Sequence, residues 1–304
     1  MSTDDLRLSG VGIAPPAHRL PGATRPGRVR LQVSDLRRSL DWYQEVLGLR
    51  ALELAEGCAS LGPQDGGSVL VELHERPGAS PVPRRGRLGL YHFAILLPDR
   101  AALGTFVRHL SELDERAGAS DHLVSEALYL TDPDGLGIEV YADRPRTAWR
   151  LRGAELVMAT EPLDLGSLLR AAGDATWQGT PAGTTIGHVH LHVGDLGMAA
   201  AFYHEALGLD KVVWSYPGAL FLSAGGYHHH LGVNTWAAGA EPARADEARL
   251  LDWELLLPDA AAVERTLASL EGAGYLAERD QAGATVADPW GTRLRIAAAD
   301  TAAG

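Results

Sequence analysis

The chain of 304 residues contains a single cysteine, Cys58. One thiol excludes an internal disulfide and any zinc site that is built from several cysteines. Cys58 lies in the segment ELAEGCASLG, which is typical of a strand edge. We therefore expect it to be a small hydrophobic residue rather than a nucleophile.

Long apolar runs and positive charge are also scarce. No stretch of about 18 apolar residues occurs, which predicts that no segment spans a membrane. The first residues, MSTDDLRLSG, lack the basic start and apolar core of a signal peptide, so we expect a cytoplasmic protein. The formal net charge is −12 and Lys211 is the only lysine. This balance argues against nucleic acid, because phosphates need a basic face.

What the sequence does contain is internal repetition. Residues 187–209, GHVHLHVGDLGMAAAFYHEALGL, repeat the pattern of residues 27–49, GRVRLQVSDLRRSLDWYQEVLGL. Each copy is typical of an alternating strand, an Asp-Leu helix start, an aromatic pair and a Leu-Gly-Leu stop. A second echo joins 90–110 to 250–270, where a strand is followed by a Pro-Asp helix start. A third joins 131–141 to 287–297, where an Asp-Pro-x-Gly turn runs into a strand.

These echoes divide the chain into four modules, at about 27–75, 88–143, 186–236 and 248–299. Each reads as a strand, a helix and two or three further strands. The predicted class is α+β, with mixed sheets curved under helices. The domain order is an irregular segment 1–26, a first repeat 27–145 (modules one and two), a linker 146–185 with a helix at 163–172, and a second repeat 186–300 (modules three and four).

Three strings, GHVHLHVGDLxxAxxFYxxxLGL, DPDGLGIEVYADRP and GGYHHHLGVNTW, resemble the vicinal oxygen chelate superfamily. This superfamily includes extradiol ring-cleaving dioxygenases, glyoxalase I, and bleomycin- and fosfomycin-resistance proteins. The likeness extends from Gly27 to about Ala299 and is nearest to bacterial catechol 2,3-dioxygenases of the two-repeat kind. It implies four βαβββ modules that form two cupped mixed β-sheet barrels, with a metal ion inside.

The resemblance also implies which residues bind the metal. The superfamily places one ligand near the start of a module's first strand and a carboxylate in its last strand. The matching ligand-type residues are His92, Glu139 and His188. Two histidines and a carboxylate form the facial triad of Fe(II) oxygenases, which leaves positions open for substrate and O₂. The implied cofactor is Fe(II), with Mn(II) as an alternative.

This triad straddles the two repeats, so the pairing of the modules decides whether it is complete. If modules two and three share one cup, all three ligands meet. The other cup then receives Arg28, Asp252 and Arg295, a charged cluster without a cation site. If the modules pair in sequence, an arginine lies beside each incomplete ligand set, which is electrostatically unfavourable. Crossed pairing is therefore favoured. Strand alternation places His188, His190 and His192 together on the cupped face.

Three further residues are implied as catalytic by the resemblance: His229, Tyr129 and His122. His229 lies in the run YHHHLGV and would be the acid–base group, with His228 and His230 on the opposite face of the same strand. Tyr129 precedes Glu139 by ten residues across the turn and would hydrogen-bond the substrate. His122 is displaced by two residues from the usual spacing. A plain His-rich strand and a buried core tyrosine stay open as alternatives.

The sequence thus predicts an Fe(II)-dependent extradiol dioxygenase that cleaves catechol or a substituted catechol with O₂ to a 2-hydroxymuconate-semialdehyde-type product. Its partners would be a small aromatic diol and O₂, with neither nucleic acid nor membrane, and a homo-oligomer stays open. One alternative is a glyoxalase-type isomerase or lyase. This type normally uses two glutamate ligands, but the module-three counterpart of Glu139 falls in the strand His228–Val233, which contains no glutamate. A thiol-transferring resistance enzyme is disfavoured for the same reason. A drug-sequestering binding protein that keeps the cup without metal is the non-catalytic alternative.

Overall fold

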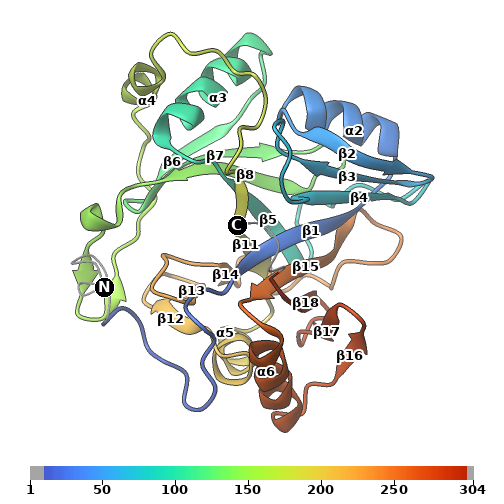
Figure 1. Ribbon diagram of the computed structural model, residues 1–304, viewed down its shortest axis with the longest axis vertical. Coiled ribbons are helices and arrows are strands. Elements are labelled where there is room, and N and C mark those ends of the chain that lie inside the picture. The colour runs from blue at the N-terminus through green and yellow to red at the C-terminus, as the bar shows by residue number, and fades with distance from the viewer. Residues whose placement is uncertain (1–9, 300–304) are drawn as a thin grey trace.

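The computed structural model describes residues 10–299 and contains two curved eight-stranded sheets (Figure 1). One has the strand order β12-β13-β14-β11-β5-β8-β7-β6, and the other β16-β17-β18-β15-β1-β4-β3-β2. We name them the β5–β11 sheet and the β1–β15 sheet after their central strands. The first combines modules two and three, and the second combines modules one and four. The pairing of modules is crossed, as the sequence favoured, and the α+β class is confirmed.

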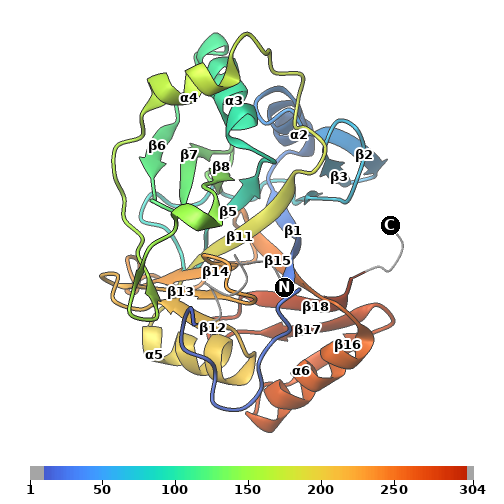
Figure 2. The ribbon, with the colours of Figure 1, turned by 60° about the vertical axis from the view of Figure 1, so that its left-hand side comes forward.

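The central strands of the two sheets lie back to back, and the cups open to opposite sides (Figures 1 and 2). In the β5–β11 sheet the strands are β5 (Gly89–Leu96), β6 (Gly118–Asp121), β7 (Ser125–Thr131), β8 (Gly137–Asp143), β11 (Thr185–His192), β12 (Asp210–Val213), β13 (Ala219–Ser223) and β14 (Leu231–Asn234). The strands of the β1–β15 sheet are β1 (Arg25–Val33), β2 (Arg50–Ala55), β3 (Cys58–Gly62), β4 (Val71–Glu75), β15 (Arg249–Leu257), β16 (Ala277–Asp280), β17 (Gly283–Ala287) and β18 (Arg293–Ala298).

Each module carries one helix that packs on its own last strand. These helices are α2 (Leu36–Glu45), α3 (Arg100–Glu112), α5 (Leu196–Ala199) with its π-type continuation η2 (Ala200–Ala206), and α6 (Ala260–Gly272). All four begin after an aspartate, Asp35, Asp99, Asp195 or Asp259, whose side chain accepts the backbone N–H three residues later. Such caps stabilise a helix by about 1 kcal/mol each. The repeated Asp-Leu and Pro-Asp motifs therefore mark true helix starts.

The apolar faces of the strands form the core beneath these helices. Val189, Leu191 and Val193 are fully buried in it, so His188, His190 and His192 point to the cupped side of β11, as alternation predicted. The histidines are buried as well, at 1%, 4% and 9% exposure. The cup of the β5–β11 sheet is thus lined by imidazoles instead of aliphatic groups.

The repeated turns and aromatic pairs hold successive modules together. Asp132 accepts the backbone N–H groups of Asp134 and Leu136 and closes the turn. Gly135 has φ +88°, which an L side chain rarely adopts. The hydroxyl of Tyr43 in module one donates to Asp132 in module two, at 3.2 Å. Tyr203 and Asp288 repeat this contact between modules three and four at 2.9 Å. Each contact therefore links the two sheets.

The linker is partly structured. It contains the turn η1 (Arg146–Ala148), the small hairpin of β9 (Leu151–Arg152) and β10 (Glu155–Leu156), and the helix α4 (Leu165–Ala172), which packs on α3. The expected helix at 163–172 is therefore present. Residues 10–24 contain only an isolated bridge, from Ile13 to Lys211. The rest of the predicted irregular segment, residues 1–9, and residue 300 of the second repeat lie outside the described residues. Between residues 10 and 299, no helix has the length and apolar character needed to cross a bilayer.

Candidate active site

The three predicted metal ligands converge inside the β5–β11 cup. His92 on β5, His188 on β11 and Glu139 on β8 lie on neighbouring strands. Nε2 of His92 is 3.0 Å from Oε2 of Glu139, and Nε2 of His188 is 3.1 Å from the same oxygen. One ligand atom from each residue lies within 4.8 Å of the other two. All three side chains are buried, so the cluster is shielded from bulk water.

The electrostatics of this cluster suit a divalent cation. Burial lowers the pKa of His188 to about 4, so its ring is neutral at pH 7. Burial alone would raise the pKa of Glu139, but His188 and His92 bring it well below its usual range. Nε2 of His92 forms no well-aligned hydrogen bond within the described residues, despite its short contact with Glu139. Two imidazoles and one carboxylate form a donor set that fits Fe(II) or Mn(II).

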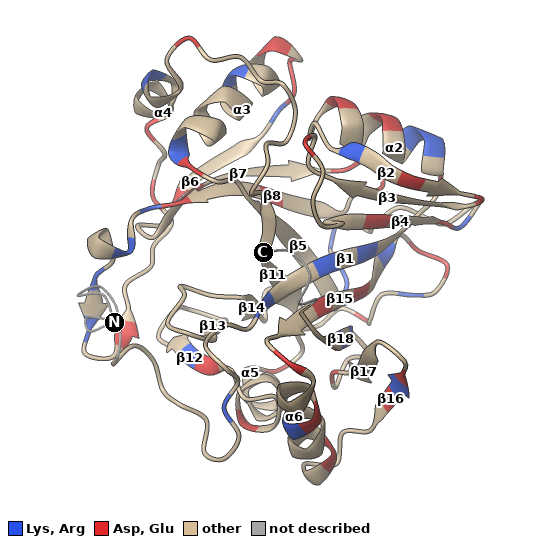
Figure 3. Ribbon diagram, in the orientation of Figure 1, with Lys and Arg blue, Asp and Glu red and all other residues tan. Residues whose placement is uncertain are grey.

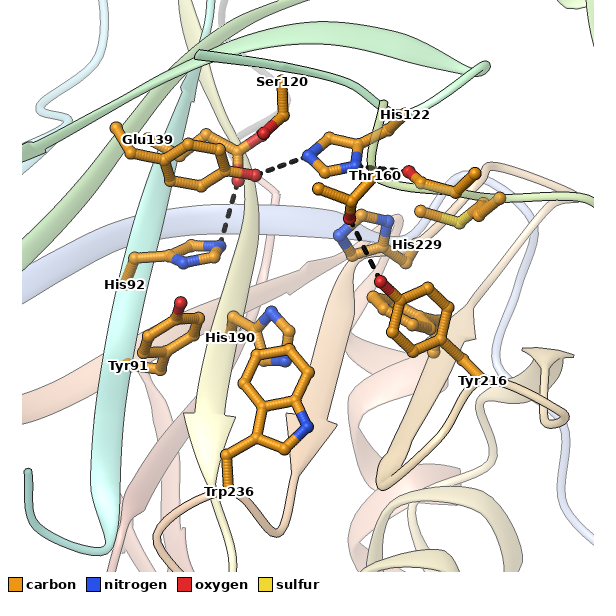
Figure 4. A pocket seen from close by; sticks show the side chains of 14 residues that line it. Tyr91, His92, Ser120, His122, Glu139, Thr160, His190, Tyr216, His229 and Trp236 are labelled. Carbon is orange, nitrogen blue, oxygen red and sulfur yellow. Dashed lines mark hydrogen bonds and ion pairs between the residues drawn. The ribbon is translucent and has the colours of Figure 1, made fainter. Parts of the chain in front are cut away.

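A cavity of about 290 Å³ opens beside the triad (Figure 4). His92 and Glu139 form part of its wall, and the ring of His229 faces the same space. The other lining residues are Tyr91, Ser120, His122, Tyr129, Met158, Ala159, Thr160, His190, Tyr216, Phe221 and Trp236. No arginine or lysine is among them. The cavity is therefore aromatic and histidine-rich, with Glu139 as its one carboxylate.

Tyr129 and His122 form a hydrogen-bonded pair in this wall. Tyr129 lies directly opposite Glu139 in the β7–β8 ladder, as the ten-residue spacing predicted. Its hydroxyl is 2.6 Å from Nε2 of His122, and Nδ1 of His122 is 2.7 Å from the carbonyl oxygen of Ala159. Because a carbonyl only accepts, Nδ1 of His122 donates to Ala159, and with the proton on Nδ1 the ring accepts from Tyr129 at Nε2. His122 thus reaches the cavity in spite of its displaced spacing.

The histidine run is placed differently from the expectation. The strand predicted over YHHHLGV begins only at Leu231, so the alternation expected for His228 and His230 does not apply. Gly225 and Gly226, with φ +64° and +69°, form a tight turn that delays the strand. His228 consequently contacts His229 instead of facing away, with their Nδ1 atoms 2.7 Å apart. The ring of His229 still lines the cavity, and its centre is 4.0 Å from that of His188.

Module three places no second carboxylate at the metal site within the described residues. Gly232 pairs with His190 between β11 and β14, just as Glu139 pairs with Ala94 between β5 and β8. Gly232 is therefore the module-three counterpart of Glu139. A Cβ on Gly232 would lie only 2.9 Å from Cγ of His190. The imidazole therefore fills the space of a second ligand, and the Nδ2 amide of Asn234 donates to its Nε2 at 3.0 Å.

Tyr91 is a cavity residue that alternation assigns to the wrong face. His190 pairs with His92, but the next residue, Leu191, pairs with Leu90. Tyr91 is therefore the extra residue of a β-bulge, which turns it to the same side as His92. Its ring centre is 5.3 Å from that of His190. Sequence reasoning also missed Met158 and Thr160, which enter the cavity from the linker. No sequence motif marks any of the three.

The opposite cup is charged, but its pairs differ from those expected (Figure 3). Asp252 pairs with Arg30 at 2.8 Å, because these two residues face each other in the β1–β15 ladder. Arg28 pairs with Glu254 at 2.9 Å, and Arg295 lies 3.7 Å from the same carboxylate. Arg28 and Arg295 therefore meet in this cup as predicted, but the carboxylate that they share is Glu254, whereas Asp252 pairs with Arg30.

Comparisons with known proteins agree with this architecture. Residues 25–140 and 185–296 match the Glyoxalase/Bleomycin resistance protein/Dioxygenase superfamily. The chain is 46% identical over 270 residues to a protein named catechol-2,3-dioxygenase from Bacillus subtilis (strain 168), covering 88% of this chain and 94% of that protein.

Solved structures show the same fold. A putative dioxygenase from Bacillus subtilis subsp. subtilis str. 168 superposes with a TM-score of 0.64 at 15% identity, over 92% of this chain and 86% of that one. A glyoxalase I variant from Zea mays superposes with a TM-score of 0.56 at 16% identity, over 91% and 94%. The chain belongs to the Glyoxalase/Bleomycin resistance protein/Dioxygenase superfamily, as its repeats, its two cupped sheets and these matches together establish.

Proposed function

We propose that this protein is an Fe(II)-dependent extradiol dioxygenase that opens catechol or a substituted catechol with O₂ to a 2-hydroxymuconate-semialdehyde-type product. The chain is an enzyme of the extradiol dioxygenase type, on the strength of its 46% identity to the Bacillus catechol-2,3-dioxygenase over 88% of its length. The observation that carries the iron assignment is the convergence of His92, Glu139 and His188 beside an aromatic cavity.

His92, Glu139 and His188 would hold the metal. When bound there, Fe(II) supplies the site at which the diol and O₂ come together and exchange electrons. The protein's task is to present two imidazoles and one carboxylate, and the lowered pKa values of His188 and Glu139 serve that task. Mn(II) takes the same donor types and is the alternative ion.

Two polar groups handle the substrate's protons. Nδ1 of His229 is engaged with His228, so Nε2 is the ring nitrogen left to face the cavity and to accept a catechol proton. The hydroxyl proton of Tyr129 points to His122, which leaves the phenolic oxygen able to accept from a substrate hydroxyl. These groups lie in one cavity wall with Glu139, so a diol placed there meets both.

The lining indicates an uncharged substrate. A carboxylated catechol would bury its anion without an arginine or lysine partner among the cavity residues, which costs several kcal/mol. Rings of Tyr91, Phe221 and Trp236 offer aromatic contacts instead. We therefore expect catechol and its alkyl- or halogen-substituted derivatives as the substrate class.

The alternatives have less support. A glyoxalase-type reaction with two glutamate ligands would need a carboxylate where Gly232 stands. A binding protein without metal would keep two histidines and a carboxylate buried around one point at an energetic cost with no return.

An oxygen-electrode experiment tests the proposal. Anaerobically loaded Fe(II) protein should consume one O₂ per catechol and form a yellow semialdehyde. His229→Ala should retain its iron and lose about 10²–10⁴-fold in turnover, the usual share of one acid–base group. His74→Ala, which removes a histidine from the opposite sheet, is the matched control and should keep wild-type turnover. Unchanged turnover in His229→Ala, or a colourless muconate product, would contradict the proposal.

A further inference from the structure

A chain of hydrogen bonds runs from the cavity to the surface through the histidine run. Nδ1 of His229 is 2.7 Å from Nδ1 of His228, and Nε2 of His228 is 2.9 Å from Oδ1 of Asp143. His228 is fully buried, whereas the side chain of Asp143 is 30% exposed. Asp143 ends strand β8, which also carries Glu139. Strand β8 thus supplies both the triad carboxylate, Glu139, and the surface end of the hydrogen-bond chain, Asp143.

The directions of these hydrogen bonds follow from the groups involved. A carboxylate only accepts, so Nε2–H of His228 donates to Asp143. With that proton on Nε2, Nδ1 of His228 offers a lone pair, which accepts from Nδ1–H of His229. That leaves Nε2 of His229 without a proton. This nitrogen has no hydrogen-bond partner within residues 10–299, and its ring lines the cavity.

The carboxylate of Asp143 also accepts a hydrogen bond from Tyr227, whose hydroxyl in turn contacts Tyr141. The hydroxyl of Tyr227 donates to Oδ1 of Asp143 at 3.1 Å, and the hydroxyl of Tyr141 lies 2.7 Å from that of Tyr227. Burial raises the pKa of Tyr227 well above its usual value, so this hydroxyl stays protonated and donating. Asp143 therefore receives two donors on one oxygen, which holds it in the orientation that His228 requires.

We propose that Asp143 and His228 are positioning residues that hold His229 in the Nδ1–H tautomer, with Nε2 presented to the substrate as the base. This inference rests on the proposed function for the identity of the proton donor. A catechol O–H bond breaks and its proton moves to Nε2 of His229, which becomes an imidazolium. Its Nδ1–H stays bonded to His228, and the negative charge of Asp143 stabilises the new positive charge through that ring. The same proton returns from Nε2 when the ring-opened product is protonated, so no further reactant is needed.

The test combines a tautomer measurement with kinetics. Full-length protein with ¹⁵N-labelled histidine rings, examined metal-free and with Zn(II), gives the tautomer of each ring by NMR, and His229→Gln identifies the signals of His229. We expect the Nδ1–H form in the wild type and mainly the Nε2–H form in Asp143→Ala and His228→Phe. In the Fe(II) enzyme, Asp143→Ala should lower kcat by about 10- to 100-fold, as for other orienting partners. Its iron content and KM should be unchanged.

Two variants separate positioning from folding. Asp143→Glu keeps a carboxylate at a partly exposed position, so it should restore the Nδ1–H tautomer and part of kcat. His204→Gln changes a buried histidine in helix η2, outside the cup, and should alter neither quantity. An unchanged tautomer in Asp143→Ala, or a loss of kcat matched by a loss of iron, would overturn the proposal. If the tautomer switches but no form of the enzyme cleaves a catechol, the positioning role stands and the proposed function fails.

Discussion

Glu139→Gln is the sharpest test of the metal site. The substitution keeps the shape of the side chain and one oxygen donor, but it removes the negative charge that faces both histidines at 3.0 and 3.1 Å. Glu139 acts to raise the pKa of His188, so its loss leaves that ring neutral at pH 7 and still able to bind. The whole effect on the metal therefore comes from the carboxylate.

The expected loss of Fe(II) affinity follows from the burial of Glu139 together with the cation that it would bind. Removing one partner from a buried charge pair costs about 3–5 kcal/mol. At about 1.4 kcal/mol for each factor of ten, Fe(II) should bind about 10²- to 4 × 10³-fold more weakly. The metal-free variant should unfold at a lower midpoint than metal-free wild type, because the carboxylate that the two histidines stabilise has been removed.

The assay is an anaerobic titration of metal-free protein with Fe(II) against a coloured chelator. Asp252→Asn is the matched control, since Asp252 is buried at the position in module four that matches His92 and pairs with Arg30 instead of a metal. This control should leave Fe(II) affinity unchanged. Binding by Glu139→Gln within about threefold of wild type, or equal weakening in Asp252→Asn, would refute the assignment of the ligands.

Two further predictions concern the surroundings of the site. In Gly232→Ala, the added Cβ would lie 2.9 Å from Cγ of His190, so the ring should move and lose its hydrogen bond with Asn234. The free energy of unfolding should fall by about 1–3 kcal/mol and KM should rise, while the iron content stays the same. A variant with wild-type KM and melting temperature would contradict this packing. Burial raises the pKa of Asp132 from 3.8 to about 6, so its carboxyl group binds a proton more tightly in the folded protein than in the unfolded chain. The stability that this protonated carboxyl contributes is present below about pH 4 and is lost as the pH rises through 6. Asp132→Asn should therefore gain about 2 kcal/mol relative to wild type between about pH 4.5 and 7 in urea unfolding, whereas a difference that does not vary with pH would argue against the shift.

The repeats made much of the site predictable. Equivalent positions exposed where His92 and His188 kept ligand-type side chains, and alternation along β11 put His190 on the cupped face. The Asp-Pro-x-Gly turn fixed the register that places Tyr129 opposite Glu139. These features depend on local periodicity, which the sequence records directly.

What escaped prediction depends on interruptions of that periodicity or on distant partners. The bulge at Tyr91 adds one residue to a strand whose apolar pattern gives no sign of it. The glycine turn before His228 shortens an expected strand. Ala159 holds His122 from a linker that carries no repeat. In each case the deciding contact lies between segments that the sequence alone does not bring together.

The crossed arrangement of the modules also sets the order in which the molecule can be completed. The β5–β11 sheet uses only residues 89–234, so all its strands are synthesised before β15 begins at Arg249. The β1–β15 sheet joins residues such as Arg30 and Asp252, which are 222 positions apart. Strand β1 therefore keeps an open edge until β15 has left the ribosome, and closing so long a loop is slow. The cup with the triad can thus be assembled first, and the charged sheet forms later, when residues 249–298 pair with residues 25–75.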